Sequence, residues 1–143
     1  MNGIKMSDCR FYVNEPERTI VCVIPNTKRM VHEFIDDNCP ESPFWMDDKL
    51  YNKICLPHSF SGKAVCAKDD EWNEELGRMI AFSRAKNKCY KSFFKRANIY
   101  VQTIDRKLGE TIETFNDFGL KLESKREALE TKIEKAMGTL VEE

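Results

Sequence analysis

Residues 72–101 read "WNEELGRMIAFSRAKNKCYKSFFKRANIYV", and this stretch decides the fold. Its large apolar residues recur at steps of three and four, which is the spacing of a helix with one buried face. The spacing continues toward the C-terminus, so the whole second part of the chain is predicted to be helical. The apolar series comprises Trp72, Leu76, Met79, Ile80, Tyr90, Phe93, Phe94, Ala97, Val101, Ile104, Leu108, Ile112, Phe115, Leu122, Leu129, Ile133 and Met137.

The helical part is preceded by an acidic stretch. Asp69 or Asp70 is the expected N-cap, and the negative charge that follows suits the positive end of a helix dipole. No proline occurs after Pro57, so long helices are permitted. Gly109 and Gly119 are the expected breaks, and the sequence therefore predicts two long helices.

The heptad-like spacing from about Phe93 to Met137 predicts that these helices pack on other helices. One helix cannot bury such a stripe alone. It either folds back as a hairpin at Gly109 or Gly119, or pairs with another chain. Because the first part of the chain offers little apolar cover, we expect a homo-oligomer, a dimer or larger.

The first part of the chain is rich in β-branched and aromatic residues and in turn signals. A turn around Asn14 and Pro16 is expected to join the first two strands, and a second turn follows at residues 25–28. Prolines and acidic residues indicate that 36–59 is mostly loop. We expect strands at residues 9–13, 19–24, 29–35, 50–56 and 61–67.

The expected fold class is therefore α+β. A small antiparallel β-sheet is followed by two long α-helices that pack in a homo-oligomer. Residues 1–143 are expected to form a single domain, because that length suits one domain of ordinary size. Its antiparallel β part covers 1–68 and its helical part covers 69–143.

Composition and the pattern of apolar residues bear on where in the cell the protein is expected. The chain carries a net charge of −1 and is 41% hydrophobic, so it can bury a core. We see no basic and apolar N-terminal run typical of a signal peptide, and no apolar stretch near the roughly 20 residues needed to span a bilayer. The expected location is the cytoplasm, with no membrane partner.

The chain has six cysteines without a C-x-x-C pattern, and free thiols in a reducing compartment are the favoured interpretation. Cys55 and His58 form half of a possible zinc site at best. His32 and Cys39 would have to arrive from a distance to complete four ligands. We therefore expect no metal and no cofactor.

Positive charge concentrates between residues 78 and 107, where nine Lys and Arg accompany one acid. Arg84, Lys88, Lys91 and Lys95 share one helical stripe. Three interpretations stay open: a solvated face neutralised by the acidic tail helix, a site for an anionic ligand such as a nucleotide, and a contact with nucleic acid or a nucleic-acid-binding protein. Nucleic acid is the weakest, since the rest of the chain is acidic.

A polar gap interrupts the predicted apolar face. Ser83 lies at its centre, with Lys86 and Asn87 on the flanks. The gap predicts either a polar layer that sets helix register, or a helix that leaves the core while Lys86 reaches water. The third interpretation is a ligand recess at a subunit interface. Its candidate binding residues are Phe82, Ser83, Arg84, Lys86, Asn87, Arg78 and Tyr90.

Signs of catalysis are few. The sequence contains no Gly-rich phosphate loop, no G-x-S-x-G and no H-E-x-x-H. Neither His32 nor His58 lies in a recognisable catalytic setting, and the acids near residue 70 are explained by a helix N-terminus. We expect a binding protein, not an enzyme.

The segment "GKAVCAKDDEWNEELGRMIAFSRAKNK", residues 62–88, resembles a pattern in small phage and prophage proteins. A strand with G-x-A-x-C leads to an acidic loop, then an aromatic residue, E-x-G-R written here as E-L-G-R, and a small-residue run ending in R-A. Together with the order of elements, it is similar to the Thoeris anti-defence sponge family. Phe82 is the aromatic that matches first.

This resemblance implies a function. Members of that family bind cyclic ADP-ribose-type immune signals, glycocyclic ADP-ribose in particular, and withhold them from the bacterial effector without cleaving them. They assemble as dimers or larger oligomers with ligand pockets at a dimer interface, and some hold cyclic oligonucleotides at a second site. The alternative from another class is an anti-CRISPR-like inhibitor of a host nuclease complex. A purely structural interaction protein is the third possibility.

Overall fold

The computed structural model describes residues 3–39 and 46–142, with side chains to residue 138. Contacts divide the chain into two units, Met1–Thr103 and Ile104–Glu143, which are described separately below. Within the described residues, no helix combines the length and apolar character needed to cross a membrane. The expectation of a single domain, with parts meeting near residue 68, stays a prediction.

The first unit contains a three-stranded antiparallel sheet in the order β1-β2-β3. Strands β1 (Arg10–Asn14), β2 (Thr19–Pro25) and β3 (Ser59–Val65) follow a short 3-10 turn, η1 (Met6–Asp8). Along β2 the side chains alternate, so that Ile20, Cys22 and Ile24 are buried and their neighbours are half-buried. The strands predicted at 9–13, 19–24 and 61–67 are confirmed, each displaced by no more than two residues.

Two of the predicted strands are wrong. Of residues 29–35, all but the first lie in helix α1 (Met30–Asn38), and 50–56 overlap helix α2 (Asp48–Lys53). Their apolar residues are spaced for a helix face, because Met30, Val31 and Ile35 are all buried in α1. The Asp47 carboxylate accepts a hydrogen bond of 2.8 Å from the amide of Leu50 and caps α2.

Helix α3 (Glu74–Glu142) is one uninterrupted helix, so the prediction of two long helices is wrong. Asn73, not Asp69 or Asp70, caps its start, since the side-chain oxygen accepts a 3.0 Å hydrogen bond from the amide of Leu76. Gly109 and Gly119 do not break the helix, and glycine costs only about 1 kcal/mol in a helix interior. No hairpin forms within the described residues. The coarser fold class is confirmed: a small antiparallel sheet and a long C-terminal helix.

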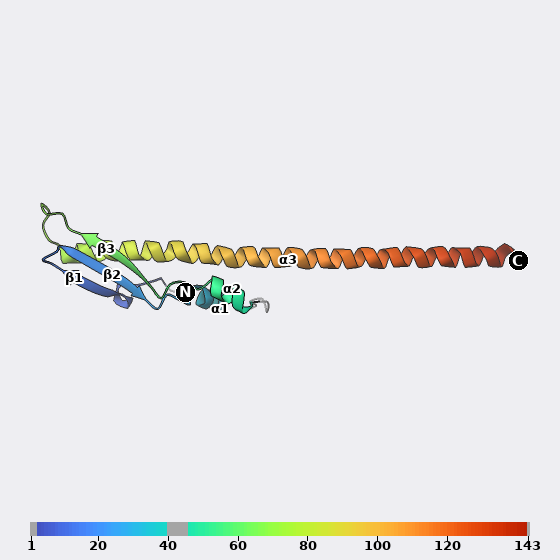
Figure 1. Cartoon of the computed structure of the whole chain (residues 1–143), viewed down its shortest axis with the longest axis horizontal. Coiled ribbons are helices and arrows are strands. Elements are labelled where there is room, and N and C mark those ends of the chain that lie inside the picture. The colour runs from blue at the N-terminus through green and yellow to red at the C-terminus, as the bar shows by residue number, and fades with distance from the viewer. Residues whose placement is uncertain (1–2, 40–45, 143) are drawn as a thin grey trace. The chain divides into compact units, whose positions relative to one another are not determined.

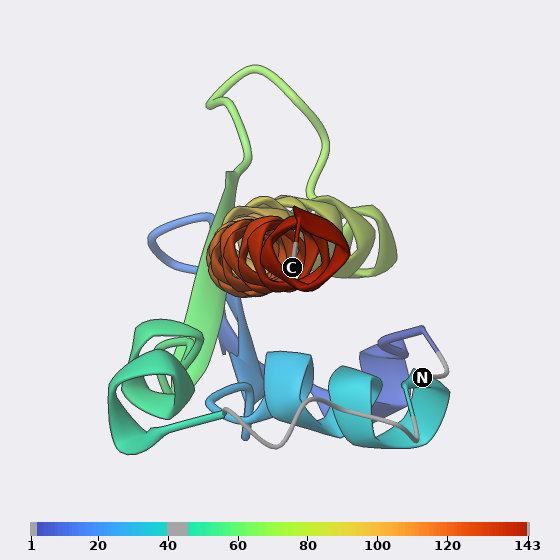
Figure 2. The ribbon, with the colours of Figure 1, turned by 90° about the vertical axis from the view of Figure 1, so that its right-hand side faces the viewer.

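The first turns of α3 lie against one face of the sheet, and α1 and α2 lie beside α3 further along the helix (Figures 1 and 2). α1 meets α3 where Met30 Sδ accepts a hydrogen bond of 3.5 Å from Cys89 Sγ, and where the Phe34 and Phe93 rings meet edge to face at 5.6 Å. The face of α3 that is buried here is a stripe with mostly small residues. It consists of Ala81, Ala85, Cys89, Phe93 and Tyr100.

The predicted core face of α3 is therefore wrong. Leu76, Met79, Phe94 and Val101 are exposed, and Ser83 lies exposed among them. The physical reason is the close approach of two backbones. A Cβ added to Gly62 of β3 would collide with the backbone of α3, so only small side chains fit where the strand and helix cross.

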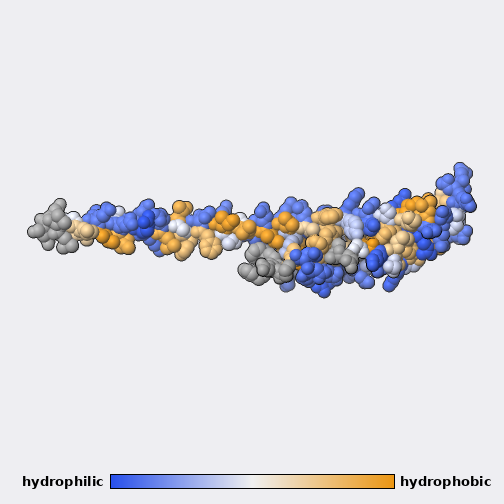
Figure 3. Space-filling model, turned by 180° about the vertical axis from the view of Figure 1, so that it is seen from behind, coloured by the Kyte–Doolittle hydropathy of each residue, from blue (hydrophilic) through white to orange (hydrophobic). Residues whose placement is uncertain are grey.

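The second unit consists of residues 104–143 of α3. Between residues 108 and 137 its large apolar side chains are exposed, and Figure 3 shows apolar surface recurring along α3. Arg106 pairs with Glu110 at 2.9 Å in the same unit. The exposed apolar residues of this unit are Leu108, Ile112, Phe115, Phe118, Leu120, Leu122, Leu129, Ile133 and Met137.

Candidate functional site

The seven predicted binding residues lie on more than one side of α3, and their recess at a subunit interface stays a prediction. Ser83 and Asn87 are exposed on the outward face of α3, beside Ile80 and Phe94. Tyr90 is half-buried. The polar gap is therefore real, but it interrupts an uncovered apolar surface instead of the internal core of the unit.

A second group of predicted residues lies on another side of α3. Arg78 places its guanidinium carbon 5.0 Å from the centre of the Phe11 ring, and its Nε lies 3.5 Å from the Glu74 carboxylate. One turn further on, Phe82 is half-buried with the Lys86 ammonium 5.0 Å from its ring centre. Arg78 and Lys86, which the sequence analysis proposed as ligand-binding residues, thus each make a cation–π contact within the chain.

Two of the four basic residues that share one stripe of α3 form hydrogen bonds with the sheet. Arg84 donates to the carbonyl of Lys63 at 2.6 Å, and Lys88 donates to the carbonyl of Ser61 at 3.0 Å. Both carbonyls belong to β3, an edge strand of this sheet. Satisfying its outer carbonyls protects an edge that could otherwise pair with another chain. Both side chains are exposed and also bind the sheet edge, so the ligand site proposed from the sequence for Arg84 stays a prediction.

Arg96 has the same kind of role. It donates to the carbonyl of Lys53 at 2.9 Å, at the end of α2, where helix carbonyls lack internal partners. Lys91 and Lys95 remain exposed. The sequence shows that these cations share one side of a helix, but only the position of the sheet edge and of α2 reveals which carbonyls they meet.

The segment 62–88 also has a structural explanation. Gly62 and Ala64 of β3 and Ala81 and Ala85 of α3 are the small residues at the strand–helix contact. Gly77 lets the helix approach Ile20, since an added Cβ would lie 2.5 Å from its Cδ1. No family model, curated protein or solved structure matches the chain. Packing accounts for Gly62, Ala64, Gly77, Ala81 and Ala85.

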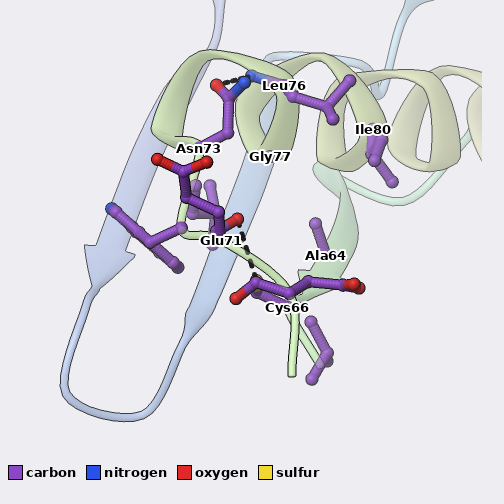
Figure 4. Close-up of a pocket in the computed structure, with 11 residues that line it drawn as sticks. Ala64, Cys66, Glu71, Asn73, Leu76, Gly77 and Ile80 are labelled. Carbon is purple, nitrogen blue, oxygen red and sulfur yellow. Dashed lines mark hydrogen bonds between the residues drawn. The ribbon is translucent and has the colours of Figure 1, made fainter. Parts of the chain in front are cut away.

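A cleft that the sequence did not predict lies between β3, the loop after it and the start of α3 (Figure 4). Its volume is about 200 Å³. Leu76 and Ile80 of α3 and Ala64 of β3 line it, and Trp72 lies at the helix start. Asp70 and Glu71 also line this cleft, so it suits an apolar group and disfavours phosphates.

The loop that walls this cleft is fixed by Arg18. One guanidinium nitrogen donates to the carbonyl of Ala67 at 3.1 Å, to the carbonyl of Asp70, and to Cys66 Sγ at 3.0 Å. Cys66 Sγ in turn donates to the carbonyl of Glu71 at 3.7 Å (Figure 4). Arg18 has a φ of 53°, in the left-handed region that few non-glycine residues adopt. The cleft is therefore pre-formed.

The zinc ligands considered from the sequence come together only in part. His32 is buried, its Nε2 lies 2.9 Å from the carbonyl of Tyr51, and Cys55 Sγ is 4.0 Å from the same nitrogen. Cys39 is exposed. Across residues 3–39 and 46–142, no three His, Cys, Asp or Glu side chains gather as a metal site would require.

Proposed function

We propose that this chain is a binding protein that works as a homo-oligomer, and that it withholds a cyclic ADP-ribose-type signal without cleaving it, as a phage or prophage anti-defence sponge. One observation supports it most. The polar gap at Ser83 and Asn87 lies on an apolar face of α3 that none of the described residues covers. A second copy packed on that face would enclose the gap at a subunit interface.

The groups around the gap suit a nucleotide. Ser83 and Asn87 offer a hydroxyl and an amide for hydrogen bonds, and Lys91 adds an exposed positive charge one turn further along. Phe94 is 69% exposed and provides a flat apolar surface for a base. The resemblance suggests the ligand class, and the uncovered face supports a site at the gap. The acidic cleft near Trp72 is not part of this proposal.

Isothermal calorimetry with cyclic ADP-ribose isomers tests the proposal. Asn87→Ala is expected to weaken binding about tenfold or more, because a hydrogen bond to a charged group contributes about 1.5–3 kcal/mol. Asn116→Ala, an exposed asparagine elsewhere on α3, is the matched control and should bind like the wild type. Arg84 is a poorer target, since its exchange also releases the carbonyl of Lys63.

Mass spectrometry of ligand released by heat completes the test. Intact ligand is expected, and a chemically changed ligand would mean that the chain is an enzyme. Absence of heat for every isomer would overturn the ligand assignment. Co-purification with a host nuclease complex in that case would favour the anti-CRISPR-like alternative.

A further inference from the structure

The second unit carries a regular apolar repeat. Leu108, Phe115, Leu122 and Leu129 follow one another at intervals of seven residues. Their exposed fractions are 50%, 70%, 51% and 58%. Two isoleucines occupy the adjoining row, four residues after the first and the last of these: Ile112 and Ile133, exposed at 51% and 49%. The repeat is thus a coiled-coil pattern with its packing face open.

None of the described residues of this unit packs against the apolar face of the repeat. The unit is one helix, and the described part of the chain contains no hairpin that would bring a second helix onto it. A helix in a protein gains most of its stability when its apolar face packs against another element, and a solitary helix in water lacks that contribution. A second copy offers a stripe of the same length and spacing, so the repeat is complementary to itself.

We propose that residues 108–136 of two copies form a parallel, in-register, two-stranded coiled coil. With Leu122 at position d, the d row also holds Leu108, Phe115 and Leu129, and the a row holds Ile112 and Ile133. β-branched residues at a with leucine at d favour two parallel strands over higher oligomers. The inference deepens the proposed function, because it names how the oligomer is built.

The flanking charges select the orientation. Lys125 falls at g and Glu130 at e. In a parallel pair, g of one helix lies opposite e of the next heptad in the other, so Lys125 of each copy meets Glu130 of the other, twice by symmetry. An antiparallel pair centred here would set lysine against lysine and glutamate against glutamate. Electrostatics therefore favours the parallel arrangement.

Arg126 occupies an a position and explains how register is fixed. Within its own helix it pairs with Glu130 at 3.2 Å and with Glu123, so its charge is already neutralised beside the apolar face. A single polar residue at a specifies register and strand number at some cost in stability. Gly119, also at a, leaves open space, since an added Cβ meets nothing within 4 Å. We therefore expect a measurable monomer–dimer equilibrium.

Sedimentation equilibrium of the full chain tests the coiled coil. Leu122→Asp is expected to raise the dimer dissociation constant at least 100-fold, because it places a charge in the apolar seam. Ser124→Asp introduces the same charge two residues away, at the outward position f, and should leave the constant within threefold of the wild type. A wild-type chain that sediments as a monomer throughout, or equal effects of the two exchanges, would overturn the proposal.

Cysteine cross-linking tests the orientation. Ala136→Cys at position d is expected to form a disulfide with its own counterpart in a parallel, in-register pair. Cross-links between Ala136→Cys and Leu108→Cys chains would instead show an antiparallel pair and overturn the orientation. The outcome is separate from the ligand assignment. A dimer that binds no cyclic ADP-ribose isomer contradicts only the ligand assignment. A monomer that binds one contradicts the coiled coil and the site between subunits, and leaves the ligand class unchanged.

Discussion

Exchange of Gly62 for alanine is expected to lower the free energy of unfolding by about 3 kcal/mol or more, measured by chemical denaturation. The added Cβ would collide with the carbonyl oxygen of Ala81 and the amide nitrogen of Ala85, and would lie 2.9 Å from Arg84 Cβ. Over-packing costs about 1–3 kcal/mol where side chains can adjust. Here two of the three neighbours are helix backbone, so strand and helix must separate.

Two control variants isolate this cause. Ser61→Ala removes an exposed side chain beside Gly62 in the same strand, and a change within about 0.5 kcal/mol is expected. Gly109→Ala adds a Cβ to α3 where nothing lies within 4 Å, and should stabilise that helix by up to about 1 kcal/mol. If Gly62→Ala unfolded at the wild-type denaturant concentration, the close strand–helix crossing would be wrong.

The sequence predicts those elements that have a clear local signal, in residue type or in flanking turns. Strands β1, β2 and β3 were predictable because they contain β-branched or aromatic residues and because turn residues follow β1 and β2. α1 and α2 were missed because Val31, Phe34 and Ile35 are also strand formers, and a helix of six residues has little room for periodicity. The cap at Asp47 was the local signal that could have identified α2.

The face of α3 that packs on the sheet was predicted wrongly, because the packing residues are small. Periodicity finds the large apolar residues, but the helix packs on the sheet through Ala81, Ala85 and Cys89, which look like spacers in a sequence. The large residues instead form an uncovered surface. Apolar residues in one helix can therefore serve two purposes. Some pack against the sheet of the same chain, and others are available to pack against a further partner. Sequence alone does not tell them apart.

The candidate site was predicted in the same incomplete way. The gap at Ser83 and Asn87 was predictable because it interrupts a regular spacing. The fate of the cations was not, because Arg84 and Lys88 reach carbonyls more than 20 residues away in sequence. A positive charge on a helix can bind a ligand, an edge strand or an aromatic ring, and only the tertiary fold decides which.

The stability of the fold is expected to fall steeply in alkali because of two buried thiols. Burial, with the charge of Cys9 and a hydrogen bond to it as lesser causes, raises the pKa of Cys22 from 9.0 to about 12. Burial raises the pKa of Cys89 from 9.0 to about 11. Both thiols stay neutral in the folded chain at a pH where the unfolded chain has already lost their protons.

The sign follows from the bound protons. Below pH 9 both states hold the Cys22 proton and the thiol adds no pH dependence; above it the unfolded state ionises first, so the free energy of unfolding decreases as pH rises toward 12. At 1.36 kcal/mol per pH unit, the full loss from Cys22 is about 4 kcal/mol, and about 2 kcal/mol of it is expected by roughly pH 10.5.

Denaturation at pH 8 and at about pH 10.5 measures this loss in the wild type and in Cys22→Ala. The variant should lose about 2 kcal/mol less than the wild type between the two conditions, because alanine has no proton to release. Cys39→Ala removes an exposed thiol and should keep the wild-type pH dependence. All other titratable groups are common to the chains compared, so their contributions cancel in the comparison. Equal losses in Cys22→Ala and the wild type would show that Cys22 is not shielded from water, and would contradict the packing of α3 on β2.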